Sequence, residues 1–158
     1  MRAPSAADAD VSPHSRRQAW MAVLARAPRA DLEQVVAEVG GLPAHTVLKA
    51  AQTGTVMVEA RAGGTGRRFN VGEATVTRCV IRLPSGAMGF AYALGTDRRK
   101  ALLAAVLDAL LQDADSGHVI ERNTIAALAA RQHAARELAQ RKAAATKVDF
   151  FTLVRGQD

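Results

Sequence analysis

Apolar residues near the start of the chain recur every three or four positions, the spacing that places them on one face of an α-helix. This spacing predicts three short helices: one from Ser15 to Pro28, a second that ends at Gly40-Gly41, and a third from Pro43 to Gly54. Proline and glycine suit helix ends, because proline lacks the amide hydrogen and glycine readily adopts a left-handed conformation. The inner faces of the three helices would be formed by Trp20, Val23, Leu24 and Ala27, by Leu32, Val35, Val36 and Val39, and by Val47, Leu48 and Ala51.

The period of the pattern changes to two in the middle of the chain, as expected for β-strands. Residues 56–61 and 74–83 alternate in this way, and residues 88–94 follow a Pro84-Ser85-Gly86 turn as a returning strand. One face of that last strand carries only glycine and alanine, which would let a helix lie close against it. These features predict an antiparallel β-meander.

Helical spacing returns after the meander. Thr96 or Asp97 can cap a helix whose broad apolar stripe would cover the sheet, and Ser116-Gly117 ends that helix. An alanine-rich, basic helix is then predicted from Asn123 to Lys147, followed by an extended, apolar segment over 148–156. Residues 1–14 lack periodicity and are expected to form a disordered tail. The fold class predicted for residues 15–158 is therefore a single α+β domain, with short N-terminal helices, an antiparallel meander and C-terminal helices packed on the sheet.

Composition and charge limit the class of protein and the kinds of partner that the chain can have. Hydrophobic residues make up 49% of the chain and charged residues 23%, values typical of a folded domain rather than of a disordered one. Lys and Arg outnumber Asp and Glu by 21 to 15, a net charge of +6 that favours anionic partners. The single Cys79 excludes an intrachain disulfide, and its place on an apolar strand face predicts a core thiol. The chain has no apolar run of the roughly 18 residues that a membrane span needs, so we expect a soluble, cytoplasmic protein without a membrane partner.

A glycine-rich loop between two predicted strands is the clearest candidate for anion binding. Glycines can turn backbone N–H groups toward an anion, and arginines can add bidentate contacts to phosphate. The loop lacks the Gly-Lys-Ser/Thr of a P-loop and no helix follows it, so a hairpin loop with solvated arginines is the alternative interpretation. The candidate anion-binding residues are Gly63, Gly64, Thr65, Gly66, Arg67, Arg68 and, further along the chain, Arg78.

No pattern in the sequence indicates a complete catalytic centre. The four histidines are scattered, and we expect neither a metal site nor a cofactor held by this chain alone. Glu59, Glu73 and Asp97 are not spaced as a pair for acid–base catalysis, and Glu59 could instead form an ion pair with Arg61 or Arg78. The basic helix over 131–147 could lie on nucleic acid, but the chain has few aromatic residues to stack on bases. A solvated face, or one docked on an acidic partner, is the stronger interpretation of that helix.

Four segments together resemble a known family. They are Trp-Met-Ala-Val-Leu-Ala at 20–25, Thr-Gly-Thr-Val-Met-Val-Glu-Ala-Arg at 53–61, Gly-Glu-Ala-Thr-Val-Thr-Arg at 72–78 and Val-Asp-Phe-Phe-Thr-Leu-Val-Arg-Gly at 148–156. Over about Arg16 to Gly156 the chain resembles PhnG, a subunit of bacterial carbon–phosphorus lyase. Such long, ordered segments are far more specific than a lone glycine loop.

The resemblance implies a role in phosphonate catabolism, within a core complex that also contains PhnH-, PhnI- and PhnJ-type subunits. In that family, PhnI with PhnG, PhnH and PhnL replaces the adenine of ATP with an alkylphosphonate, and PhnJ later breaks the C–P bond. The nucleosidase chemistry is attributed to PhnI, so the resemblance implies a companion subunit rather than the catalytic chain. A stand-alone triphosphate-binding enzyme and a nucleic-acid-binding module are the alternatives that the residues alone leave open, the second being the less favoured.

The C-terminal segment is the candidate partner interface. Read as a strand, it places Phe150 and Val154 on one side and Phe151 and Leu153 on the other, so both sides require burial. Docking on the domain's own sheet and docking on a partner are the two possibilities, and the partner is favoured because a long helix is already available to cover the sheet. The proposed interface residues are Phe150, Phe151, Leu153, Val154 and Arg155.

Overall fold

The computed structural model describes residues 13–113 and 117–146 and confirms an α+β fold with one three-stranded antiparallel sheet. The strands follow one another in the sheet in the order β1-β2-β3, which is the predicted meander. The elements in chain order are α1 (Pro13–Arg26), α2 (Arg29–Glu38), β1 (Thr46–Arg61), the short 3₁₀ turn η1 (Ala62–Gly64), β2 (Arg68–Arg82), β3 (Met88–Leu94), α3 (Arg98–Leu110), α4 (Gly117–Ile120), the π-helical turn η2 (Glu121–Ile125) and α5 (Ala126–Ala145).

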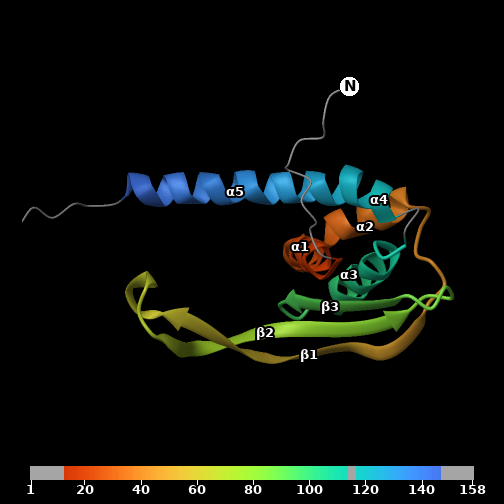
Figure 1. The fold of residues 1–158 in the computed structure, drawn as a ribbon, viewed down its shortest axis with the longest axis horizontal. Helices are drawn as coiled ribbons and strands as arrows, with labels where there is room; N and C mark the ends of the chain where they lie inside the picture. The colour runs from red at the N-terminus through yellow and green to blue at the C-terminus, as the bar shows by residue number, and fades with distance from the viewer. Residues whose placement is uncertain (1–12, 114–116, 147–158) are drawn as a thin grey trace, which may run out of the picture.

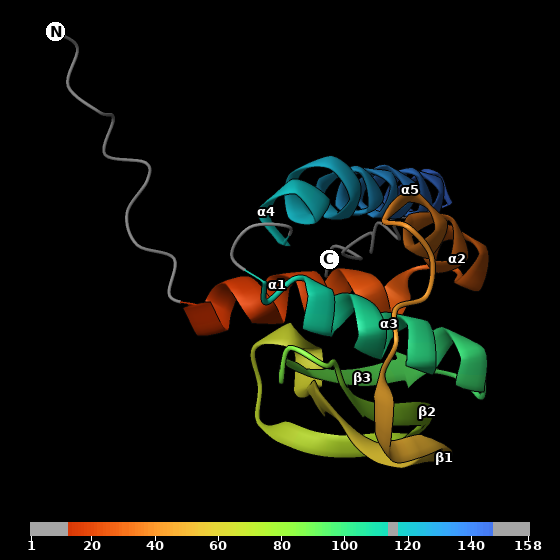
Figure 2. The same ribbon diagram turned by 90° about the vertical axis from the view of Figure 1, so that its right-hand side faces the viewer.

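All the helices lie on one side of the sheet (Figure 1). When the molecule is turned, α1 and α3 lie next to each other directly above the strands, and α2, α4 and α5 form a further layer above them (Figure 2). The buried core lies between these layers; its largest fully buried side chains include Leu24, Leu32, Ile81, Leu103 and Leu107. The other face of the sheet is not covered by any described element (Figure 1).

Helix α3 packs unusually close to β3, as the small face of that strand predicted. Ala91 and Ala93 are buried against the helix, and a Cβ atom added at Gly89 would lie 1.8 Å from the carbonyl oxygen of Ala105. Only a residue without a side chain fits at that position. The start of α3 is capped by Asp97, whose Oδ1 accepts a hydrogen bond of 2.9 Å from the backbone N–H of Lys100.

The predicted helix over Pro43–Gly54 is wrong, because this segment is the first part of the long strand β1. Val47 pairs with Ile81, and Gln52 pairs with Arg78, but the register shifts twice between them. Such irregularities add residues to one strand and break the alternation of period two. The hydrophobic pattern of this segment therefore does not alternate as a strand should. Its extended conformation is determined by pairing with β2.

The two helices at the start of the fold are confirmed. Trp20 and Leu24 of α1 and Leu32, Val35 and Val36 of α2 are buried. Helix α2 ends before two glycines with positive φ, and the N–H of Gly41 donates to the carbonyl of Val36 over 2.8 Å. Helix α1 begins at Pro13, inside the predicted tail, of which residues 1–12 lie outside the described part.

Two elements project from the same side of the body (Figure 1). One is the far end of the β1–β2 hairpin, where residues 55–59 and 67–73 are exposed. The other is the second half of α5, where every residue from His133 to Ala145 is exposed. Helical structure in this region begins earlier than the predicted Asn123, at Gly117, and passes through the π-helical turn η2 before α5.

Polar contacts fasten the C-terminal helices to α1 and α2. The carboxylate of Glu121 accepts hydrogen bonds from Arg16 Nε at 2.8 and 3.1 Å. At the start of α5, Gln132 Nε2 donates to the carbonyl of Val23 over 2.9 Å, and Arg131 lies 3.3 Å from Asp31. The described side chains of α5 beyond these contacts extend into open space.

Candidate functional site

The glycine-rich loop joins β1 to β2 at the far end of the hairpin, as predicted, and it is closed largely by its own backbone. Gly63 and Gly64 have positive φ values of 57° and 83°. The N–H groups of Thr65 and Gly66 both donate to the carbonyl of Ala62. Two of the N–H groups that could have faced an anion therefore stabilise the turn itself.

The arginines of this loop are exposed, and only one has an ion-pair partner among the described residues. Arg68 lies 3.7 Å from Glu59, so Glu59 pairs with a residue other than the predicted Arg61 or Arg78. Arg67 is exposed as well. A pair as exposed as Arg68 and Glu59 contributes little to stability, which leaves both arginines available for an anion or a partner.

Arg78 is not part of the same cluster. It lies in the middle of β2, where it pairs with Gln52 on one side and Tyr92 on the other. Ten residues of extended strand separate it from Arg68, roughly 33 Å at the usual rise per residue. The structure thus leaves Arg67 and Arg68 exposed at the end of the hairpin and places Arg78 on the uncovered face of the sheet.

The predicted partner interface at Phe150, Phe151, Leu153, Val154 and Arg155 lies outside the described residues, as does Lys147. The described part of the basic helix carries Arg131, Arg136, Arg141 and Lys142. Within the described segments no ion pair joins the last three to a carboxylate, whereas Arg131 is paired with Asp31. This half of α5 therefore presents an excess of positive charge to solvent.

A buried carboxylate of α3, in contact with α1 and with β3, was missed by the sequence analysis. Asp108 of α3 is 0% exposed. Its Oδ1 accepts hydrogen bonds from Arg17 Nε at 3.1 Å and Trp20 Nε1 at 2.9 Å. Its Oδ2 accepts from Arg17 Nη2 at 2.6 Å and from the backbone N–H of Phe90 at 2.9 Å. The one local signal was an aspartate within the apolar stripe of α3.

Asp108 and Arg17, together with Gln112, also cap part of the free edge of the sheet. The backbone groups of Gly95 and Ala87 form hydrogen bonds with β2. Because backbone direction alternates along a strand, the even-numbered residues of β3 point their N–H and C=O groups away from β2. Besides the N–H of Phe90, the carbonyl of Met88 is occupied, by Arg17 Nη2 at 3.1 Å and by Gln112 Nε2 at 2.8 Å. Such capping protects an edge strand from pairing with another chain, so Asp108 acts as a structural group.

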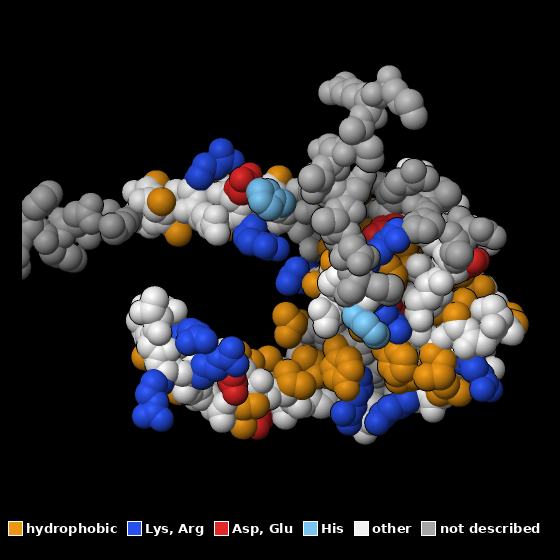
Figure 3. All heavy atoms as spheres, in the orientation of Figure 1, with side chains coloured by type: hydrophobic (Ala, Val, Ile, Leu, Met, Phe, Trp, Pro, Cys, Tyr) orange, Lys and Arg blue, Asp and Glu red, His pale blue; other side chains and the backbone are white. Residues whose placement is uncertain are grey.

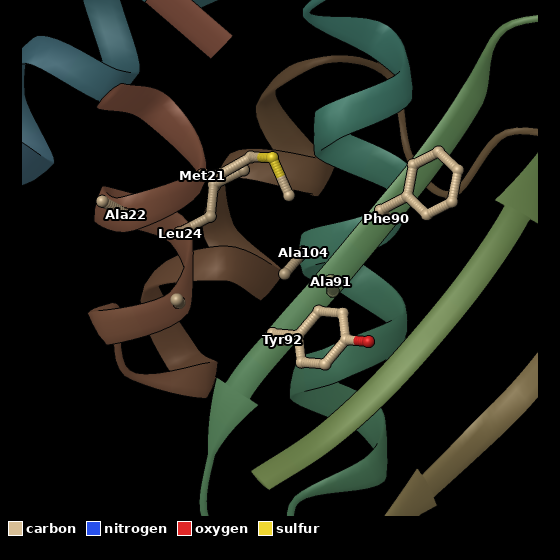
Figure 4. Close-up of a pocket in the computed structure, with 8 residues that line it drawn as sticks. Met21, Ala22, Leu24, Phe90, Ala91, Tyr92 and Ala104 are labelled. Atoms are coloured by element: carbon tan, nitrogen blue, oxygen red, sulfur yellow. The ribbon is translucent and has the colours of Figure 1, made fainter. Parts of the chain in front are cut away.

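A groove of about 210 Å³ lies beside the remaining part of that edge, between α1 and β3. Met21 and Leu24 enter it from the helix, and Phe90 and Tyr92 border it from the strand (Figure 4). None of its lining residues is charged. The groove suits an apolar side chain and lacks the cations that a triphosphate requires.

The remaining candidate groups have structural surroundings. Cys79 is buried, and burial raises the pKa of its thiol above the ordinary value, as expected for a core cysteine. His133 faces Glu137 one turn along α5 at 3.7 Å. In the ranges 13–113 and 117–146 no three His, Cys, Asp or Glu side chains are close enough to hold a metal ion. In the same ranges no helix is long and apolar enough to cross a bilayer.

Comparison with known proteins places these features in a family. Residues 15–156 match the family described as phosphonate metabolism protein PhnG. The chain is also 40% identical, over 148 residues, to the alpha-D-ribose 1-methylphosphonate 5-triphosphate synthase subunit PhnG of Rhizobium meliloti strain 1021. That alignment covers 91% of this chain and 92% of the relative. Since the match extends over all of the described fold from residue 15 onward, including the hairpin, Asp108 and α5, the chain belongs to the PhnG family of phosphonate metabolism proteins.

Proposed function

We propose that the chain is a subunit of the synthase that transfers the ribose triphosphate moiety of ATP to an alkylphosphonate, with displacement of adenine. The observation that carries this proposal is the extent of the family match, which runs from 15 to 156. The relative from Rhizobium meliloti, 40% identical, is named as the PhnG subunit of such a synthase. The partners would be PhnH- and PhnI-type subunits with PhnL, and PhnJ-type subunits in the same core complex, all in the cytoplasm.

The described side chains support a companion role rather than a catalytic one. The most buried carboxylate, Asp108, has four hydrogen-bond donors and keeps the helices and the strand edge together. Glu121 is held by Arg16, and Glu59 by Arg68. Asp108 and Glu121 are thus occupied by contacts within the fold, and Glu59 already faces a cation, so the bond changes at the ribose are assigned to a partner chain.

The loop arginines are the part of this chain that we assign to an anion. Arg67 and Arg68 are exposed at the far end of the hairpin, away from the core, where a partner could present a triphosphate or an acidic surface to them. Charge-assisted hydrogen bonds from a guanidinium suit both. The C-terminal residues Phe150, Phe151, Leu153, Val154 and Arg155 are proposed as a further contact with a partner.

Co-expression and reconstitution test the proposal. The chain would be produced together with the other subunits, purified through a tag on this chain, and assayed for adenine release from ATP in the presence of methylphosphonate. We expect adenine release by the complex and none by the purified chain alone. Robust, phosphonate-dependent release by the repurified single chain would contradict the companion role, and failure of the chain to co-purify with any subunit would contradict the proposed function itself.

A further inference from the structure

The uncovered face of the sheet has a side-chain pattern that does not suit open water. Residues paired across antiparallel strands share a face, so the register assigns each side chain of the meander to one side. Ala91 and Ala93 are on the helix-covered side, and with them their partners Cys79 and Thr77. The other side, which we call the outer face, contains the rows Leu94–Val76–Gly54 and Tyr92–Arg78–Gln52; of these, Val76 is buried between its neighbours.

Large apolar side chains are exposed on the outer face. Tyr92 is 55% exposed and Leu94 62%. The same side of the hairpin continues with Val56, Val58 and Phe69, which are also exposed. A solvated face of an antiparallel sheet normally carries polar side chains, whereas contiguous apolar exposure usually marks an interaction site.

The charges on the outer face all have one sign. Lys49, Arg78 and Arg82 belong to it by register, and the two glutamates of the hairpin, Glu59 and Glu73, belong to the other side. In the space-filling view hydrophobic side chains form a band along the sheet. Lys and Arg side chains lie along its lower border, and Asp or Glu side chains appear there only toward the far end of the hairpin (Figure 3). A complementary surface would be apolar with carboxylates placed opposite these cations.

We propose that the outer face is the docking surface for a protein partner whose own surface is apolar and bordered by Asp and Glu. This inference rests on the proposed function, because the partner would be another subunit of the synthase. A second copy of the chain fits less well, since two outer faces would bring Lys49, Arg78 and Arg82 against the same cations. Nucleic acid would leave the apolar rows without contacts. The groove between α1 and β3 adjoins this face at Tyr92 and would accept an apolar side chain of the partner.

Charge insertion tests the outer face in the co-expressed complex. In the double variant Tyr92→Glu with Leu94→Glu, two exposed positions gain negative charge that would oppose the partner's carboxylates. The matched control is Leu42→Glu, an exposed leucine in the loop before β1. We expect at least tenfold less co-purified partner with the double variant, and wild-type amounts with the control.

A second pair of variants keeps the test independent of the apolar residues. Arg78→Glu reverses a charge on the outer face, and Arg99→Glu reverses one in the first turn of α3, where a negative charge suits the helix dipole. We expect Arg78→Glu to lower the amount of bound partner at least tenfold and Arg99→Glu to leave it unchanged. Circular dichroism melts of the isolated chains would show that each variant folds.

The outcomes separate the two proposals. If wild-type chain co-purifies with the other subunits and the folded outer-face variants do so equally well, the docking surface is wrong and the proposed function stands. If wild-type chain binds no subunit, the proposed function fails. Sizing of the isolated chain as a dimer that Leu94→Glu dissociates would overturn the inference in favour of a second copy. Binding of the isolated chain to phosphatidylglycerol vesicles or to a duplex of random sequence, lost in Arg78→Glu, would overturn it in favour of those ligands.

Discussion

Arg17 and Asp108 form a two-point ion pair between α1 and α3, with Arg17 Nη2 2.6 Å from Oδ2 and Nε 3.1 Å from Oδ1. Ninety-one positions separate them in the chain. The same carboxylate also accepts from Trp20 and from the backbone of Phe90. One buried side chain thus connects two helices with the edge of the sheet.

Asp108→Asn should destabilise the fold strongly. The carboxamide has one acceptor oxygen instead of two, and its NH₂ group would face the donors of Arg17. Breaking a buried ion pair by changing one partner costs roughly 3–5 kcal/mol, and we expect about 3 kcal/mol here because the Arg17 side chain is 30% exposed. Urea unfolding followed by circular dichroism measures the effect. Glu33→Gln, in an exposed pair with Arg29 on α2, is the control and should cost less than about 0.5 kcal/mol.

Gly89→Ala should separate α3 from the sheet. The new Cβ atom would lie 1.8 Å from the carbonyl oxygen of Ala105, so the helix must move away from β3 and lose packing along its length. We expect a loss of about 3 kcal/mol, at the upper end of what overpacking costs. The control is Gly54→Ala in β1, where nothing lies within 4 Å of the added atom and the change should stay within about 0.5 kcal/mol. Equal stabilities of the two variants would show that α3 does not require this close approach.

Cys79 should make stability depend on pH in the alkaline range. Burial raises the pKa of its thiol above the ordinary 9.0, so the folded state binds its proton more tightly than the unfolded chain does. The contribution to stability is fully present below pH 9.0 and is lost as the pH rises through the raised pKa. Urea unfolding at pH 7.5 to 10.5 should show that the difference in stability between wild type and Cys79→Ala shrinks above pH 9. A constant difference across that range would contradict the assignment.

The double variant Arg67→Ala with Arg68→Ala should lower the activity or the assembly of the complex without unfolding the chain. The only ion pair it removes among the described residues is the exposed one with Glu59, so the stability should change by less than about 1 kcal/mol. If each arginine contacts a triphosphate or an acidic surface, losing each charge-assisted contact would cost roughly 1.5–3 kcal/mol. Adenine release and co-purification at several salt concentrations give the readout. Unchanged activity and assembly would show that the loop is only a turn.

Truncation after Lys147, or Phe150→Ala with Phe151→Ala, should leave a folded chain that no longer co-purifies with its complex. The described residues already bury a core that extends from Trp20 to Leu128, which supports folding without the last segment. Burial of each large side chain contributes roughly 1.5–3 kcal/mol, so loss of both phenylalanines would weaken association by several powers of ten. An unfolded truncated chain, seen by circular dichroism, would place the segment in the core instead.

Elements with undisturbed periodicity could be predicted from the sequence. The buried stripes of α1 and α2, the alternation from Thr77 to Leu83 and the small face of β3 all match the structure. The glycine loop was located between two strands for the same reason, since turns interrupt alternation. The beginning of β1 was misassigned because two register shifts break its alternation, and nothing in the local pattern indicates which strand it will pair with.

The sequence by itself determined the α+β class, the meander and the membership of the PhnG family, because local periods and long ordered segments are properties of neighbouring residues. Only the tertiary structure decided which distant side chains meet. It brought Arg17 and Trp20 to Asp108, separated Arg78 from the loop arginines along β2, and put apolar and basic side chains together on one uncovered face. These relationships depend on the packing of helices on a sheet and on strand register. Both arise from contacts between distant segments, up to 109 positions apart for Val23 and Gln132, and such contacts leave no periodic pattern in the sequence.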